Sequence, residues 1–410
     1  MWSWGCATFG VLGNNKTIDT SSPVSVVGGF TDWCRLSTQN ARFGAVRTNG
    51  TIWMWGSNVL GDLGDNSSTS TSSPVSVVGG FTDWRELCIG FTNSLGLRSN
   101  GTVWAWGQNG SGQIGDGTTT TRSSPVSVIG GFTGWCQVSA GGGHSAGIRT
   151  NGTAWTWGVA LCGALGDNTL VNKSSPVSVV GGFTNWCQIS AGSYSTAAIR
   201  SNGTLWAWGR NTVGRLGDNT TINKSSPVSV IGGFTDWCQV SAGVCHSAAV
   251  RTNGTVWTWG ANGVGQLGDS TLVAKSSPVS VVGGFTDWCQ VSSGTAQTFG
   301  IRTNGTIWSW GFNSSGRLGD GTVTDKSSPV SVVGGFTDWC NVAAGQFHAF
   351  GIRTNGTIWG WGSGGNGRLG DNTTTNKSSP VSVAGGFTDW CQVSGGNVHS
   401  AAIRKITVGF

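Results

Sequence analysis

The chain consists of one unit of 51 residues repeated along its length, and this regularity limits the fold more than any other feature. The tetrapeptide Trp-x-Trp-Gly begins at Trp2 and recurs every 51 residues up to Trp359. Ser-Ser-Pro and Gly-Gly-Phe-Thr-x-Trp recur with the same spacing, and together these motifs account for all 24 tryptophans. One such unit cannot bury its apolar surface alone, so neighbouring units must stack against each other.

Each unit carries four strand signals and no helical periodicity. In one unit the expected strands are residues 237–242, 247–251, 255–259 and 278–282. Asn253-Gly254 predicts a two-residue hairpin in which both turn residues take positive φ. The proline at 278 is expected to open the fourth strand, where its missing N–H does no harm.

Four antiparallel strands in about 50 residues are typical of one propeller blade. The sequence therefore predicts an all-β fold: a single closed β-propeller of eight four-stranded blades built from 51-residue repeats, forming one domain over residues 1–410. The chain begins at a third strand and ends after a second strand. We expect a composite blade from residues 390–404 plus 1–27 that joins the N- and C-termini and leaves no open sheet edge. The tail at 405–410 lies outside the pattern.

Two residue types are assigned to the blade interior. Phe30 and its seven equivalents, together with the three tryptophans of each unit, are expected to fill the space between sheets. Seven of the 11 cysteines occupy one slot, from Cys34 to Cys391. Equivalent positions in successive blades are too far apart for a disulfide, so these cysteines are interpreted as small buried strand residues.

Charge and hydropathy narrow the classes of partner. The net charge is +6, but only 10% of residues are charged and lysine and arginine form no run. Nucleic-acid-binding proteins usually cluster basic residues on one face, so no specific nucleic acid is expected. No stretch approaches the 18 apolar residues of a membrane span, and no secretory signal is visible at Met1. Localisation stays open between an extracellular or virion surface and the cytoplasm.

The segment Trp-x-Trp-Gly-x-Asn-x-x-Gly-Gln-Leu-Gly at 257–268, with Ser-Ala-Gly-x-x-His-Ser as at 139–145, resembles the regulator of chromosome condensation repeat. The resemblance covers essentially the whole chain. It implies a propeller, commonly of seven blades, so eight units mean either a larger ring or a different closure. Some members are nucleotide-exchange factors for small GTPases, some bind chromatin, and one inhibits β-lactamases. The exchange factors carry insertions, which these uniform units lack, and this argues against an exchange role.

Two short segments vary among the eight units while the motifs barely change. One is the turn between the first and second strands, and the other follows Trp-x-Trp-Gly. In an up-and-down meander both lie on the same face of the disc, where loops on a rigid scaffold often bind partners. The binding residues predicted on this face are Arg42, Asn93, His144, Tyr194, Ser195, Arg210, His246, Gln297, Phe312, Phe347, His348 and His399. Drift in unconstrained surface loops remains the alternative.

Neither catalysis nor a bound cofactor is expected. The chain has a single glutamate, and no Ser-His-Asp arrangement stands out. The four histidines share one slot without a metal-binding spacing, and the Gly-Asp aspartates supply one carboxylate per loop, which suits a turn better than calcium. The favoured function is a non-enzymatic binding or structural propeller, a surface or virion component that contacts a protein or glycan, within a larger assembly. The alternative is an intracellular protein-binding regulator or inhibitor.

Overall fold

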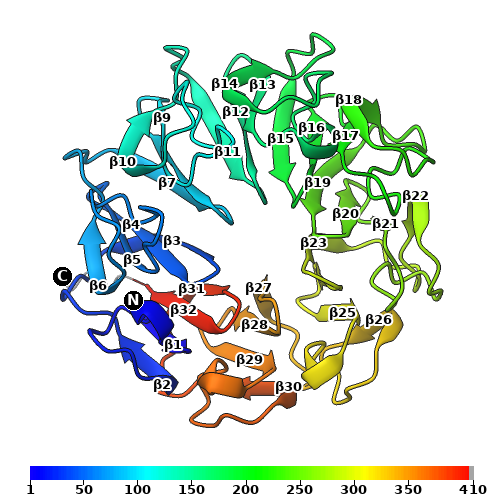
Figure 1. Ribbon diagram of the computed structural model, residues 1–410. Coiled ribbons are helices and arrows are strands. Elements are labelled where there is room, and N and C mark those ends of the chain that lie inside the picture. Colours follow the sequence, from blue (N-terminus) through cyan, green and yellow to red (C-terminus); the bar gives the residue numbers. More distant parts are fainter. Residues whose placement is uncertain (406–410) are drawn as a thin grey trace.

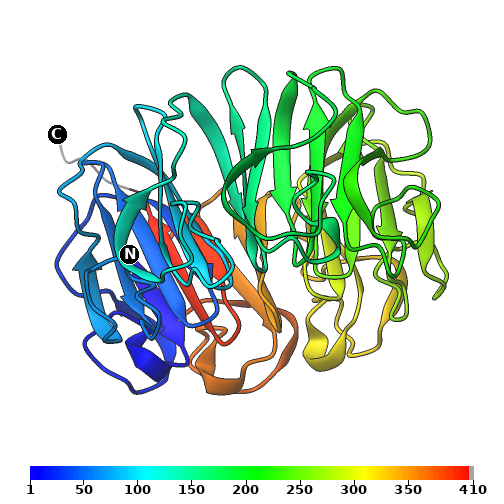
Figure 2. The same cartoon turned by 45° about the horizontal axis from the view of Figure 1, so that its top comes forward.

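Eight four-stranded antiparallel sheets stand around a common axis in the computed structural model, which describes residues 1–405 (Figure 1). In seven of the sheets, hydrogen-bonded neighbours follow one another in sequence, and the eighth combines strands from both ends of the chain. The all-β propeller and its eight blades are therefore confirmed. Seen at a tilt, the sheets form one wide ring around the axis (Figure 2).

The strands fall into four classes by their place in the blade. The first and innermost strands are β3 (Trp33–Gln39), β7 (Trp84–Ile89), β11 (Trp135–Ala140), β15 (Trp186–Ala191), β19 (Trp237–Ala242), β23 (Trp288–Ser293), β27 (Trp339–Ala344) and β31 (Trp390–Gly395). The second strands are β4 (Arg42–Arg47), β8 (Asn93–Arg98), β12 (His144–Arg149), β16 (Ser195–Arg200), β20 (His246–Arg251), β24 (Gln297–Arg302), β28 (His348–Arg353) and β32 (His399–Arg404).

The outer half of each blade follows the same plan. The third strands are β5 (Ile52–Gly56), β9 (Val103–Gly107), β13 (Ala154–Gly158), β17 (Leu205–Gly209), β21 (Val256–Gly260), β25 (Ile307–Gly311), β29 (Ile358–Gly362) and β1 (Trp2–Gly5). The fourth strands are β6 (Thr71–Ser76), β10 (Arg122–Ser127), β14 (Lys173–Ser178), β18 (Lys224–Ser229), β22 (Lys275–Ser280), β26 (Lys326–Ser331), β30 (Lys377–Ser382) and β2 (Thr20–Ser25). Short 3₁₀ turns occur at η1 (Thr8–Gly10), η2 (Leu161–Gly163), η3 (Ser314–Gly316) and η4 (Gly365–Gly367).

The two ends of the chain share one blade, as predicted. Its strand order is β2-β1-β32-β31, so β1 lies between a neighbour from its own end and one from the other. The register pairs Trp2 with Ala402 and Gly5 with His399. The backbone N–H of Lys405 also donates to the carbonyl of Asp389 at 2.6 Å. The remainder of the tail, 406–410, lies outside the described residues.

Tryptophan holds neighbouring blades together. Trp259, the second tryptophan of its motif, is fully buried and packs in one apolar cluster with Leu205 and Leu216 of the preceding blade. Its indole N–H donates to the carbonyl of Arg215 at 2.8 Å, also across the seam. Losing such a side chain typically destabilises a protein by roughly 3–5 kcal/mol. Phe234 is half-buried, and its ring centre lies 4.8 Å from that of Trp257. The guanidinium carbon of Arg251 lies 3.9 Å from the ring centre of Phe234.

Two details of the blade differ from expectation. The fourth strand begins at Lys275, three residues before the proline, which lies at a register shift in this outer edge strand. A bulged edge position tolerates the missing N–H as well as a strand start does. The Asn-Gly connection spans residues 252–255, and Gly254 takes positive φ (73°) while Asn253 does not. Asn253 instead accepts hydrogen bonds from the N–H and hydroxyl of Thr255.

The prediction that the repeated cysteines are buried was wrong. The register shifts between Trp237 and Gln239, so Cys238 is the extra residue of a β-bulge, and its side chain is exposed. The same holds for the other six cysteines of this slot. A bulge interrupts the in-and-out alternation, which is why the sequence pattern misplaced them.

The innermost strands are tied to each other by side chains. Gln239 accepts a hydrogen bond from the N–H of Val291 at 3.0 Å, and Ser241 accepts one from Ser293 at 3.0 Å. Backbone groups that would otherwise form a free sheet edge are therefore occupied by the previous blade. We conclude that this edge is closed to an added strand.

Candidate functional site

The two variable segments of each unit lie side by side. The backbone N–H of Arg210, which follows the third strand, donates to the carbonyl of Tyr194, in the turn between the first two strands, at 2.9 Å. Ser57 and Ala41 make the same bond in another blade. We call the turns between first and second strands, together with the loops between third and fourth strands, the variable face.

Eight of the predicted binding residues do not lie in the turn. Each is the first residue of a second strand, and each side chain is buried at a seam between blades. The prediction that these residues are presented by a loop was wrong, because the strand begins one residue earlier than the variable pattern suggested. These buried residues are Arg42, Asn93, His144, Ser195, His246, Gln297, His348 and His399.

Three of these buried histidines connect neighbouring blades. The Nε2 of His144 lies 2.9 Å from the hydroxyl of Thr196, which itself donates to the carbonyl of Ala164 at 3.1 Å. The threonine hydroxyl has only one proton to give, so His144 must be the donor and carry its proton on Nε2. His246 and His348 make equivalent contacts across their own seams.

Burial keeps these imidazoles neutral. Desolvation lowers the pKa of His144 and of His246 from 6.5 to about 4, and Arg215 adds to the effect at His246. Burial beside Arg368 lowers the pKa of His399 to about 3, and the pKa of His348 also lies well below its ordinary value. Among residues 1–405 no carboxylate raises the pKa of these imidazoles, so burial disfavours their protonated form.

One seam uses an ion pair instead of a histidine. Arg42 donates to Asp62 at 2.6 Å, and its other amino group reaches the carbonyls of Gly90 and Phe91 in the next blade. Both charged side chains are almost completely buried. Burial lowers the pKa of Arg42 and raises the pKa of Asp62, and their mutual attraction offsets part of each shift.

The other four predicted residues remain accessible on the variable face. Tyr194, Arg210 and Phe312 are half-buried, and Phe347 is 36% exposed. Tyr194 and Arg210 belong to adjacent segments of one blade. Phe312 and Phe347 belong to two other, neighbouring blades, and both lie near the guanidinium group of Arg317. The structure thus divides the twelve predicted residues into a buried set and an exposed set.

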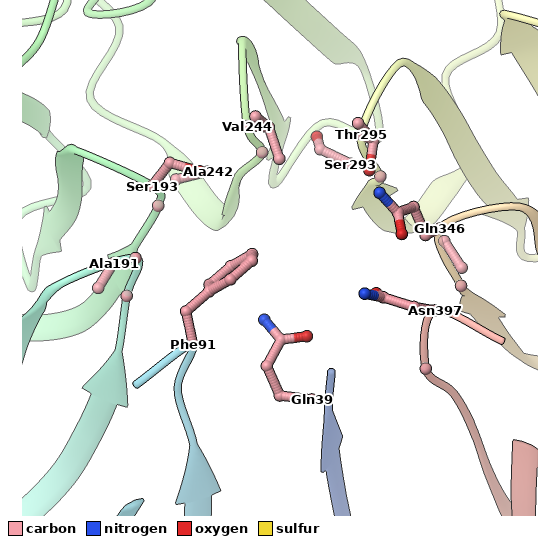
Figure 3. A pocket seen from close by; sticks show the side chains of 18 of the residues that line it. Gln39, Phe91, Ala191, Ser193, Ala242, Val244, Ser293, Thr295, Gln346 and Asn397 are labelled. Carbon is pink, nitrogen blue, oxygen red and sulfur yellow. The ribbon is translucent and has the colours of Figure 1, made fainter. Parts of the chain in front are cut away.

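A central opening on the variable face adds residues that the sequence interpretation missed. It has a volume of about 420 Å³ and is lined by the ends of seven of the first strands and by seven of the turns that follow first strands, with Phe91 alone representing the blade of β7. Figure 3 shows Gln39, Phe91 and Asn397 extending towards its centre. Phe91 is 42% exposed. The side chains that line the opening carry no formal charge.

A sequence signal for this opening did exist. Two residues before the buried second-strand position, the eight units carry seven different residue types, compared with five at the buried position itself. These residues are Asn40, Phe91, Gly142, Ser193, Val244, Thr295, Gln346 and Asn397. The residues that line or border the axis are therefore among the most diverse of the unit.

The carboxylates of the Gly-Asp aspartates accept hydrogen bonds from residues of their own loops. Asp269 accepts hydrogen bonds from the side-chain amide of Asn262 at 2.9 Å and from the N–H of Thr271 at 3.0 Å, and Lys275 lies 3.6 Å away. This matches the turn interpretation.

Within residues 1–405 no group of three or more histidine, cysteine or acidic side chains is arranged to hold a metal ion. No helix in the same range is long and apolar enough to cross a membrane.

Known proteins resemble this chain in sequence and in fold. The family model described as RCC1-like domain matches residues 127–408, and two models of the regulator of chromosome condensation (RCC1) repeat match residues 100–148 and 84–113. The ultraviolet-B receptor UVR8 of Arabidopsis thaliana is 26% identical, over 80% of this chain and 76% of its own length. The human E3 ubiquitin-protein ligase HERC2 is 27% identical over 87% of this chain, which spans only 8% of HERC2.

Two solved structures share the fold. Prp20p of Saccharomyces cerevisiae, whose structure was described with its binding properties to Gsp1p and histones, superposes with a TM-score of 0.69 at 19% identity, covering 88% of this chain and 93% of that one. Human WBSCR16 gives a TM-score of 0.68 at 18% identity, covering 99% of both chains. At these identities the likeness concerns the fold alone.

Proposed function

Because the chain belongs to the RCC1-like domain family, we propose that it is a non-enzymatic propeller that binds a protein partner through its variable face. Protein binding is a property of the yeast relative, which was described with Gsp1p and histones and was also solved in complex with Kap60. The ligase activity named for HERC2 belongs to a protein of which this chain spans 8%, and we do not extend it to this chain.

The observation that carries this proposal is the placement of the accessible variable residues. Tyr194, Arg210, Phe312 and Phe347 lie on one face, and Phe91 stands in the opening on the same face. Aromatic and arginine side chains contribute most of the binding energy in many protein interfaces. The rest of the unit repeats almost unchanged, so this face is where one blade differs chemically from the next.

Of the two functions considered from the sequence, the relatives favour the protein-binding regulator. UVR8 is named as a receptor and Prp20p was studied as a binding protein. The reading as a virion component, and a glycan as the ligand, gain no support from these relatives. We therefore favour a protein over a glycan as the partner.

The test compares two quadruple variants in partner capture. Replacing Tyr194, Arg210, Phe312 and Phe347 together by alanine is expected to weaken binding of a captured partner at least tenfold. The matched control replaces four exposed residues of the opposite face, Ser99, Thr150, Ser201 and Thr252, by alanine. Partners are identified by pull-down and mass spectrometry, and their affinities are then measured by biolayer interferometry. Equal affinity for the two variants would refute the assignment of the face.

A further inference from the structure

Four arginines on the variable face form no ion pair within the described part of the chain, and three of these share one slot in the loop between the third and fourth strands. Elsewhere the common arrangement is an ion pair, such as Arg251 with Asp236 at 2.7 Å. Arg215, Arg317 and Arg368 occupy one loop slot in three blades and form no ion pair with any of residues 1–405. No carboxylate of the described residues compensates the positive charge of these three side chains.

These guanidinium groups are held by carbonyl groups across the seams. Nη1 of Arg317 donates to the carbonyl of Gln346 at 3.0 Å, and Nη1 of Arg368 donates to that of Asn397 at 3.3 Å. Both acceptors line the central opening. Arg317 and Arg368 are only 5% and 7% exposed, and this burial lowers the pKa of both side chains. Keeping a charge this buried without a counterion is costly.

Two phenylalanines complete a cluster around these charges. The guanidinium carbon of Arg317 lies 4.5 Å from the ring centre of Phe312 and 5.5 Å from that of Phe347. The guanidinium carbon of Arg368 lies 5.7 Å from the ring centre of Phe347. We call Phe312, Arg317, Phe347 and Arg368 the arginine–phenylalanine cluster. Nη2 of Arg317 has no hydrogen-bond acceptor among residues 1–405, so one donor of the cluster is available.

The surroundings of the cluster do not neutralise it. Asp325 attracts Arg317 but forms no ion pair with it, and its carboxylate accepts the N–H of Asn313 at 2.7 Å. His348 and His399, buried beside the arginines, are neutral. The cluster therefore keeps a net positive charge beside an exposed aromatic ring.

We propose that the arginine–phenylalanine cluster binds a partner segment in which a carboxylate stands next to an aromatic side chain. This deepens the proposed function and rests on it. A carboxylate would supply the counterion that the arginines lack, through charge-assisted hydrogen bonds. An aromatic side chain would pack against Phe347, since aromatic pairs are favourable. A nucleic acid fits less well, because backbone binding needs a longer stripe of basic residues.

The experiment uses the full chain and fluorescein-labelled peptides of the sequence Asp-Phe-Asp-Gly-Asp-Phe-Asp, with an Asn-for-Asp peptide as reference. Binding is followed by fluorescence anisotropy. The variant Arg317→Gln/Arg368→Gln removes both charges, and glutamine already occupies this loop slot at Gln113 and Gln266, so the fold tolerates it. The control Arg149→Gln/Arg200→Gln lowers the net charge equally on the opposite face, where these arginines also lack an acidic partner.

The acidic peptide should bind at least tenfold more tightly than its reference, and the cluster variant should lose at least tenfold in affinity while the control loses less than threefold. Equal losses in both variants would show that only net charge matters, and would overturn the proposal. Failure to distinguish the two peptides, or tighter binding of a single-stranded oligonucleotide, would also overturn it. If the cluster fails while the alanine variant of the variable face still loses its protein partner, protein binding stands and only the partner chemistry is wrong.

Discussion

Acidification from pH 7 to pH 5 is expected to remove about 2 kcal/mol of folding free energy for each buried seam histidine. His144 and His246 have folded pKa values of about 4, compared with 6.5 for an exposed imidazole. Below pH 6.5 these histidines therefore bind protons in the unfolded chain, whereas in the folded chain they stay neutral. The folding free energy is unaffected by the titration of these histidines above pH 6.5, and it becomes less favourable as the pH falls from 6.5 towards 4.

The pKa of His399, about 3, implies a similar loss, so His144, His246 and His399 together remove roughly 6 kcal/mol of folding free energy. His348 acts in the same direction. This is a large part of the 5–15 kcal/mol that stabilises a typical protein.

The pKa values of Asp116, Asp218 and Asp269, for example, lie below their ordinary 3.8, so these aspartates do not titrate in this range. The amino group of Met1 does titrate here, because burial lowers its pKa from 8.0 to about 6, and it adds to the loss. Substitution of a histidine therefore isolates the histidine contribution.

Urea unfolding followed by tryptophan fluorescence at the two pH values measures this effect. The variant His144→Gln should reduce the pH dependence by about 2 kcal/mol, because glutamine occupies the same buried slot at Gln297, where it bonds the carbonyl of Gly345 at 3.0 Å. An unfolding midpoint that does not move between pH 7 and pH 5 would show that the seam histidines are not buried as described.

The second large effect is expected at the buried ion pair. Replacing Asp62 by asparagine leaves the guanidinium of Arg42 charged, buried and without a counterion. Breaking such a pair from one side typically destabilises a protein by about 3–5 kcal/mol. Thermal and urea unfolding should both register the loss.

A double variant distinguishes the effect of the uncompensated charge on stability from the effect of altered packing. Arg42→His/Asp62→Gln reproduces the residues that another blade carries at these two positions, His246 and Gln266. It should recover most of the stability lost in the single variant, since the buried charge is gone. Equal destabilisation by the single and double variants would mean that packing, and not the uncompensated charge, controls this seam.

The fold was predictable because each local signal occurs eight times. The spacing of Trp2 and Trp53 defined the unit, and the break between Arg404 and Trp2 defined the closing blade. What failed was the detail that depends on irregular backbone. A β-bulge turned Cys238 outwards, and a register shift put the fourth strand's start at Lys275.

The candidate site was predictable only in part. Variation marked the turns of the variable face, but residues also vary where they pack differently at each seam, as at His144 and Arg42. Polar residues in a variable segment are typical of an exposed loop. The sequence of one unit does not show that side chains of the neighbouring blade bury them. The arginine–phenylalanine cluster was hidden for the same reason, because Arg317 and Phe347 come from different blades.

The central opening and the common variable face both require the ring to be closed by the composite blade, and amide hydrogen exchange of the unmodified protein tests this most directly. Strand β1 contributes residues 2–5 between β2 and β32. Read out by mass spectrometry, its amides should exchange as slowly as those of the corresponding third strands, such as residues 256–260 in β21. Rapid exchange in residues 2–5 and 399–404, with slow exchange in the other blades, would mean that the ring is open and would contradict the closure.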